Sequence, residues 1–124
     1  MTYAAVGASG AVVDLLTLAA LLHLGVVLPV ARAISIAAAL TWNFSGNERL
    51  TFDCQRPGRL RRFANFALAC SLGATINYGV SLFLPLFIPM LTNWPLPTAL
   101  LGIIFGSTIN FLLARHWVFA ITRQ

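Results

Sequence analysis

WNFSGNERLTF, at residues 42–52, returns in altered form near the end of the chain as INFLLARHWVF, at residues 109–119. Both stretches hold an asparagine, then a phenylalanine, then a basic side chain and a final phenylalanine. The alignment pairs Asn43 with Asn110, Phe44 with Phe111, Arg49 with His116 and Phe52 with Phe119. A second block, upstream of each stretch, pairs Gly10 with Gly73 and Asp14 with Asn77. The simplest explanation is a two-helix hairpin that was duplicated, and the alternative is chance similarity between apolar, glycine-rich stretches.

The composition of the chain is that of a membrane protein. Hydrophobic residues make up 59% of the sequence and charged residues only 9%, whereas about 25% of residues are charged in ordinary soluble domains. A spanning helix needs roughly 20 mostly apolar residues, and four such windows lie at about 5–27, 31–50, 63–87 and 96–118. The sequence therefore predicts an all-α membrane protein with four transmembrane helices, built as two tandem parallel-repeat helical hairpins.

We expect a single transmembrane domain over residues 1–124, with repeat one at about 1–52, a basic loop at about 53–62 and repeat two at about 63–124. This arrangement leaves little chain for a soluble unit that binds a nucleotide. The sequence has neither a paired-Asp motif for a metal-nucleotide nor Cys or His residues at zinc spacing. The pattern favours a carrier or partner protein over an enzyme, with no catalytic residue, no cofactor and no metal.

The basic residues indicate how the helices are oriented. All eight are Arg, and all except Arg32 lie in the middle connection or near the C-terminal end. Because short Arg-rich loops stay in the cytoplasm, we expect a multi-pass protein of the cell inner (cytoplasmic) membrane with both termini cytoplasmic. The net charge of +5 is then explained by topology and by contact with anionic lipids, with no nucleic acid as a partner.

Small and polar residues recur at steps of three and four, which places them on one face of each helix. In the first and third spans these faces are Gly7, Gly10 and Asp14, and Cys70, Gly73 and Asn77. In the second and fourth spans they are Ser35, Ala39, Asn43 and Asn47, and Gly102, Gly106 and Asn110. We expect the faces of the second and fourth spans to pack tightly against each other.

Asp14 is the only acidic residue well inside an expected span. A charged residue near the bilayer centre costs roughly 2.5 to 3.5 kcal/mol on insertion scales, so it needs a partner or a cavity. Two interpretations stay open. Either Asp14 lines a pathway for a substrate or for protons, or its role is structural, near the inner interface or as a neutral group hydrogen-bonded to Asn43 or Asn77.

Asn43 and Asn110 lie one turn inside the basic ends of their helices and are expected to face each other or the opposite hairpin. Each is followed by a cation, Arg49 or Arg115, and an Arg side chain offers a fork of donors that matches phosphate oxygens. One interpretation is a phosphate site at the cytoplasmic headgroups. The other is structural hydrogen bonding between helices, worth about 0.6 kcal/mol on average. We also expect Glu48 to pair with Arg49.

NFSGNERLTF and NFLLARHWVF, each closing the second helix of a hairpin, resemble the asparagine, phenylalanine and basic-aromatic ending of the GtrA-like family. The short spacing to VGASGAVVD, the adjacent Arg62 and Phe63, and the four-span size also fit, so the resemblance covers essentially the whole chain. Two features depart from the family pattern. The chain begins almost directly in the first span, and the first copy has Ser45, Gly46 and Glu48 where an asparagine-arginine-rich ending is more usual.

The resemblance implies a small membrane protein of cell-surface polysaccharide synthesis that translocates (flips) a polyprenyl-phosphate-linked sugar across the cytoplasmic membrane. It also implies a membrane-associated glycosyltransferase as a partner. Under this hypothesis the lipid phosphate is received by Arg49, Arg115 and Arg62. The polar seam for the sugar then consists of Asp14, Asn43, Asn47, Asn77 and Asn110.

Two alternatives to a flippase remain open. One is a membrane scaffold that supports the glycosyltransferase without transporting anything, and the other is a small proton-coupled exporter that depends on Asp14. Because four helices make a narrow bundle, we expect a homodimer or a complex with the transferase.

Overall fold

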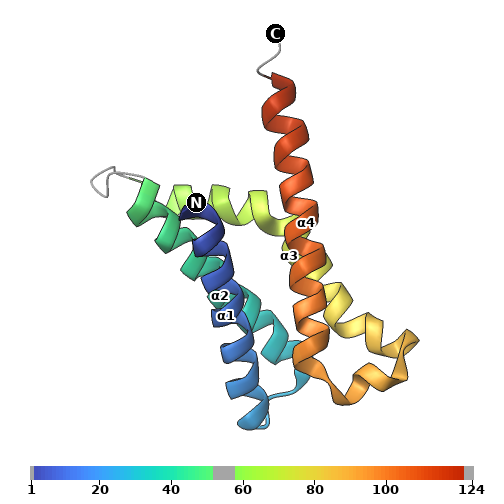
Figure 1. The fold of residues 1–124 in the computed structure, drawn as a ribbon. Helices are drawn as coiled ribbons and strands as arrows, with labels where there is room; N and C mark the ends of the chain where they lie inside the picture. Colours follow the sequence, from blue (N-terminus) through green and yellow to red (C-terminus); the bar gives the residue numbers. More distant parts are fainter. Residues whose placement is uncertain (1, 52–57, 122–124) are drawn as a thin grey trace. The chain divides into compact units, whose positions relative to one another are not determined.

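The computed structural model describes the backbone of residues 2–51 and 58–121, and the side chains at 5–49, 58–110 and 112. Over these ranges the elements are four α-helices and one short 3-10 helix, with no strand. In chain order they are α1 (Thr2–His23), α2 (Leu28–Thr51), α3 (Arg59–Phe87), η1 (Pro89–Asn93) and α4 (Pro95–Ile121) (Figure 1). The predicted all-α fold with four long helices is confirmed.

The chain divides into two compact units, Met1–Ala69 and Cys70–Gln124, which we call the first unit and the second unit. The first unit holds α1, α2 and the first turns of α3, and the second holds the rest of α3 with η1 and α4. The third helix begins at Arg59, four residues earlier than the expected span at 63. Gly58, with φ of 88°, makes the turn before it, and no helix breaker separates Arg59 from the apolar part of α3.

The turn between α1 and α2 is closed by Gly25, whose φ is 80°. The Gly25 N–H donates to the Leu22 carbonyl and the Val26 N–H to the Leu21 carbonyl, both at 3.0 Å. This pair of bonds is a Schellman motif, which requires a left-handed residue that glycine adopts without steric cost. A four-residue connection then leads into α2, so α1 and α2 lie side by side as a hairpin (Figure 1).

Pro85 lies inside α3, which ends two residues later at Phe87. Pro89 opens η1, and the residue before a proline is driven out of the helical region. Ile88 accordingly has non-helical backbone, with φ of −125° and ψ of 86°. The sequence predicts that these two prolines kink or end the third helix, and the structure confirms that the helix ends there.

Polar groups are buried and large apolar groups face outward, which is the reverse of a soluble protein. The buried polar or charged side chains among the described residues are Asp14, Arg32, Ser35, Glu48, Asn77, Ser81 and Thr98. Leu16, Leu68 and Phe83 are among many large hydrophobic side chains that are mostly exposed. Two described helices, Ala5–His23 and Arg59–Phe87, are long and apolar enough to cross a membrane, and α4 contributes an apolar stretch at Pro95–Asn110.

Burial repeats between the two units in step with the sequence. Most buried positions on the inner faces of α1 and α2 have a buried counterpart in α3 or α4, and Val6 is an exception, because Ala69 is exposed. The buried pairs are Gly10 with Gly73, Asp14 with Asn77, Leu18 with Ser81, Ala31 with Thr98, Arg32 with Ala99, Ser35 with Gly102, and Ala39 with Gly106. The same faces therefore form the inside of both units, although only the first unit has charges at these positions.

Candidate functional site

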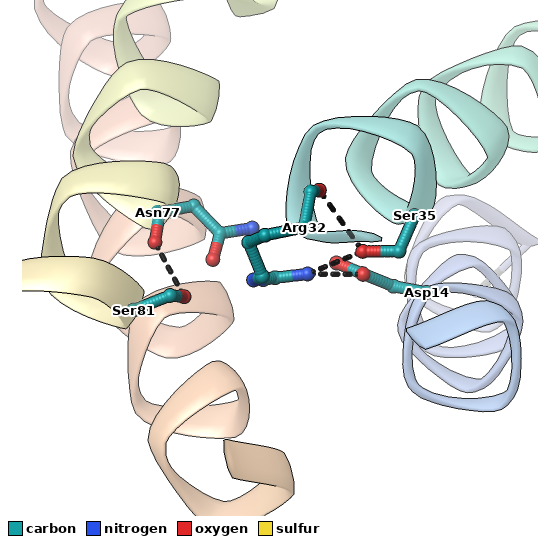
Figure 2. Close-up of polar contacts among 5 residues, drawn as sticks. All are labelled: Asp14, Arg32, Ser35, Asn77 and Ser81. Carbon is teal, nitrogen blue, oxygen red and sulfur yellow. Dashed lines mark hydrogen bonds and ion pairs between the residues drawn. The ribbon is translucent and has the colours of Figure 1, made fainter. Parts of the chain in front are cut away.

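The most buried charges in the described part of the chain form an ion pair inside the first unit. Asp14 of α1 is 2% exposed and Arg32 of α2 is 0% exposed. Arg32 Nη1 donates to Asp14 Oδ1, and it also donates to Ser35 Oγ at 2.7 Å. Ser35 Oγ in turn donates to the Arg32 carbonyl oxygen at 3.0 Å (Figure 2). The serine and the carboxylate thus bind the same guanidinium nitrogen, and the carboxylate neutralises its charge.

Asp14 is therefore ion-paired, which corrects the structural interpretation in which it is neutral and hydrogen-bonded to Asn43 or Asn77. Arg32 is a functional candidate that the sequence pattern does not single out, because the positive-inside rule concerns only the Arg residues in loops. The sequence does contain one signal for this pair, because a single Arg and a single Asp in adjacent apolar spans are each costly in the membrane unless they form an ion pair. An intramembrane charge costs roughly 2.5 to 3.5 kcal/mol on insertion scales, and such charges are therefore usually found paired with one another.

Each unit sets an asparagine of its second helix against a glycine of its first helix. A Cβ at Gly10 would lie 2.6 Å from Asn43 Cγ, and one at Gly73 would overlap the Asn110 amide. Asn43 and Asn110 therefore pack within their own hairpins. This corrects the expectation that they face each other or the opposite hairpin, because a side chain that fills a glycine notch on its nearest neighbour has no reach beyond it.

The two asparagines differ in hydrogen bonding. Asn110 Oδ1 accepts the backbone N–H of Gly73 at 3.1 Å. Asn43 Oδ1 is buried and has no hydrogen-bond partner within the described ranges. A buried polar atom without a partner is uncommon in folded proteins. Because only the Asn110 oxygen is hydrogen-bonded, the two copies of the motif differ in their chemistry.

The small-residue face of α4 packs on α3 within the second unit. A Cβ at Gly106 would overlap the Gly73 carbonyl oxygen, and one at Gly102 would lie 2.5 Å from Asn77 Oδ1. Ser81 Oγ donates to the Asn77 carbonyl oxygen at 2.7 Å (Figure 2). The expectation that this face packs against the second span is wrong for these glycines, because helices joined by a short connection become each other's nearest partners.

At the far end of α2, Glu48 binds two arginines of α3. Glu48 Oε2 accepts from Arg59 Nε at 2.9 Å, and Oε1 accepts from Arg62 Nη2 at 2.5 Å. The expected pair between Glu48 and Arg49 is not formed, since neighbouring residues point to different sides of a helix. Arg49 is exposed.

Aromatic packing joins the same two helices in the first unit. Phe44 lies edge-on to Phe63, with 5.2 Å between ring centroids, and 5.7 Å from Phe66. We call this group, together with the Glu48 ion pairs, the α2–α3 clasp. Arg62 is therefore half-buried and held by Glu48.

The transmembrane-domain model of the GtrA/DPMS family matches residues 2–119, which is nearly the whole chain. This chain belongs to the GtrA/DPMS family. Comparisons with curated proteins and with solved structures gave no match. Membership makes the chain an all-α membrane protein and supports a role in glycosylation that uses polyprenyl-phosphate sugars.

The structure brings together some of the residues that the GtrA resemblance singled out, and separates others. Asn43, half-buried Asn47 and exposed Arg49 share the C-terminal half of α2, while Asp14 lies with Arg32 toward the other end of that helix. Arg115 falls within α4, but its side chain is outside the described ranges, as is the loop at 52–57. Among the described residues no group of three His, Cys, Asp or Glu side chains could hold a metal ion.

Replacing Glu48 by Gln is expected to loosen the α2–α3 clasp and lower the melting temperature of the purified protein. The neutral amide leaves Arg59 and Arg62 without their carboxylate, while Phe44 still holds the two helices. Because Arg59 is 67% exposed, we expect a smaller loss than for any change at Arg32. Thermal unfolding in detergent, followed by circular dichroism, measures the shift. Arg61→Gln, which removes an exposed cation of α3 next to Arg62, is the matched control. An equal shift of the melting temperature in both variants contradicts a stabilising role of the Glu48 ion pairs.

Proposed function

We propose that this protein translocates a polyprenyl-phosphate-linked sugar across the cytoplasmic membrane, beside the glycosyltransferase that makes it. Family membership supports the class of substrate. The observation that carries the transport proposal is the Asp14–Arg32 ion pair, which lies buried inside an apolar hairpin. Charged residues inside a membrane segment are costly and are found mainly where a substrate, ion or proton passes.

In this proposal Arg49 receives the lipid phosphate at the cytoplasmic end of α2, together with Arg115 of the second copy. Arg49 is exposed, whereas Arg62 is bound by Glu48. Arg62 therefore binds the lipid phosphate only when its ion pair with Glu48 opens. A guanidinium is suited to this task because its donors match two phosphate oxygens at once.

In this proposal the sugar moves along the polar residues of the helices. The Asn43 side-chain oxygen, which has no hydrogen-bond partner in the described structure, supports this path. Asn43 Oδ1 is buried without a partner in the described structure, and a sugar hydroxyl is a donor that would satisfy it. Asn47, one turn further along α2, lies between Asn43 and the headgroup end. Asp14, Asn77 and Asn110 complete the proposed polar seam.

Reconstitution tests this function directly. Liposomes that contain the purified protein and a fluorescent polyprenyl-phosphate sugar are expected to show protein-dependent flipping. Arg49→Ala is expected to slow it at least tenfold, since a hydrogen bond to a charged group is worth about 1.5–3 kcal/mol. Arg61→Ala, which removes an exposed cation outside the proposed site, is the control and should flip at the wild-type rate.

The same experiment decides between transport and the scaffold alternative. A scaffold for the glycosyltransferase gives no flipping above that of protein-free liposomes, whatever residue stands at position 49. The mass of the active particle in detergent then tests the proposed homodimer or transferase complex, because an active monomer excludes both.

A further inference from the structure

The second helix carries a cation near each of its ends. Arg32 lies in the second turn from Leu28, and Arg49 lies in the last turn of α2. At about 1.5 Å per residue they are separated by roughly 26 Å of helix, close to the thickness of the hydrocarbon core, roughly 30 Å. The positions between them include the buried Ser35 and the Asn43 oxygen that has no partner in the described structure.

We propose that Arg32 and Ser35 form a second phosphate-binding station, at the opposite end of α2 from Arg49, and that the Asp14 carboxylate occupies this station when no lipid phosphate is bound. The proposal rests on the proposed function, because the phosphate is taken to be that of a polyprenyl lipid. In the structure, Asp14 Oδ1 stands where a phosphate oxygen would bind.

The chemistry of the contacts supports such an exchange. Arg32 Nη1 donates to both Asp14 Oδ1 and Ser35 Oγ, and the guanidinium fork accommodates a carboxylate or a phosphate equally well. A lipid-linked sugar phosphodiester carries one negative charge, as the carboxylate does, so the exchange keeps the charge around Arg32 constant. Ser35 stays on the guanidinium in both states.

The second unit shows that hairpin packing does not need the ion pair. Asn77 stands in the place of Asp14, Ala99 in that of Arg32 and Gly102 in that of Ser35, and all three are buried. That hairpin closes through Gly73 and Gly106 without any charge at these positions. Since a buried ion pair rarely stabilises a fold more than well-packed neutral residues do, the charges of the first unit have a role other than packing.

The test measures binding of farnesyl phosphate, a short water-soluble polyprenyl phosphate, to the full chain in detergent by calorimetry, with farnesol as the uncharged control. Asp14→Asn removes the competing carboxylate and is expected to tighten binding at least fivefold. The double variant Asp14→Asn with Arg32→Gln is expected to weaken binding at least tenfold relative to Asp14→Asn alone. Arg61→Gln is the matched cation control and should bind as the wild type does.

Folding of each variant is checked by its helical circular dichroism and its elution as a single species. If Asp14→Asn does not fold, Arg32→Lys keeps the cation beside Asp14 and is expected to weaken farnesyl phosphate binding several-fold, because an ammonium lacks the fork. Unchanged binding in Arg32→Lys, or weaker binding in folded Asp14→Asn, overturns the proposed second phosphate-binding station. The Asp14–Arg32 ion pair would then have only a structural role. A double variant that binds farnesyl phosphate as tightly as Asp14→Asn alone has the same meaning.

The binding experiment and the flipping experiment distinguish a failure of the second phosphate-binding station from a failure of the proposed function. A wild-type protein that binds farnesyl phosphate through Arg32 but flips no lipid in liposomes refutes the proposed function and keeps the station. A protein that flips lipid equally well with Asp14→Asn and Arg32→Gln together keeps the function and refutes the station.

Discussion

Arg32→Gln is expected to lower the free energy of unfolding by about 3–5 kcal/mol, which is the usual result of removing one partner from a buried ion pair. Asp14 would keep a charge at a position that is 2% exposed, with no cation to neutralise it. Ser35 would also lose the guanidinium that donates to its hydroxyl at 2.7 Å. Unfolding in detergent by increasing fractions of denaturing surfactant, followed by circular dichroism, measures the change.

The double variant separates charge from packing. Asp14→Asn together with Arg32→Gln leaves two neutral amides that can hydrogen-bond to each other, so most of the lost stability is expected to return. This recovery would match the second unit, where Asn77 and Ala99 are buried at the corresponding positions without charge. Arg61→Gln, at an exposed position, should stay within about 0.5 kcal/mol of the wild type. A single variant as stable as the wild type would show that the pair contributes nothing to the fold.

Gly106→Ala is expected to destabilise the second unit by about 1–3 kcal/mol, the range for an added group in a closely packed interior. A Cβ there would overlap the Gly73 carbonyl oxygen and lie 3.1 Å from Asn77 Cβ. The carbonyl belongs to the backbone of α3, so the whole helix has to move away from α4. That movement would also strain the bond in which Asn110 Oδ1 accepts the Gly73 N–H.

Gly79→Ala is the matched control in the same unit. A Cβ at Gly79 would meet only Phe83 Cδ2, at an ordinary contact distance of 3.9 Å. Because alanine is the better helix former by about 1 kcal/mol, this variant is expected to be as stable as the wild type or more so. Melting temperatures measured in one detergent compare the two substitutions, and a loss in Gly79→Ala as large as that in Gly106→Ala would contradict the packing account.

Much of the helical architecture could be predicted from the sequence. Windows of about 20 apolar residues separated by glycine, proline and arginine predict helices and membrane location with little ambiguity, because a bilayer accepts few other structures. The start of the third helix is the exception, since the sequence pattern places Arg59, Arg61 and Arg62 in the loop, whereas they belong to α3. A count of apolar residues ends a span at the first charges, although Arg is a good helix former and Glu48 holds two of these arginines.

The partners of the polar side chains could not be predicted in the same way. Periodicity shows that Asp14 shares a helix face with Gly10, but it does not show which residue of the next helix meets that face. The register of α1 on α2 is fixed by the turn at Gly25 and by the Asn43 side chain in the notch at Gly10. Arg32 then reaches Asp14 through a long side chain, whose end cannot be placed from the position of its Cα.

By itself, the sequence determined the membrane class, the four helices and the repeated glycine, asparagine and small-residue faces, because these depend on local composition and helical period. Only the tertiary structure decided that Asp14 pairs with Arg32, that Glu48 binds Arg59 and Arg62, and that Asn43 and Asn110 each fill a notch in their own hairpin. The physical reason is that the energy of a buried polar group depends on the partner within about 3 Å of it, and that partner is set by how two helices pack.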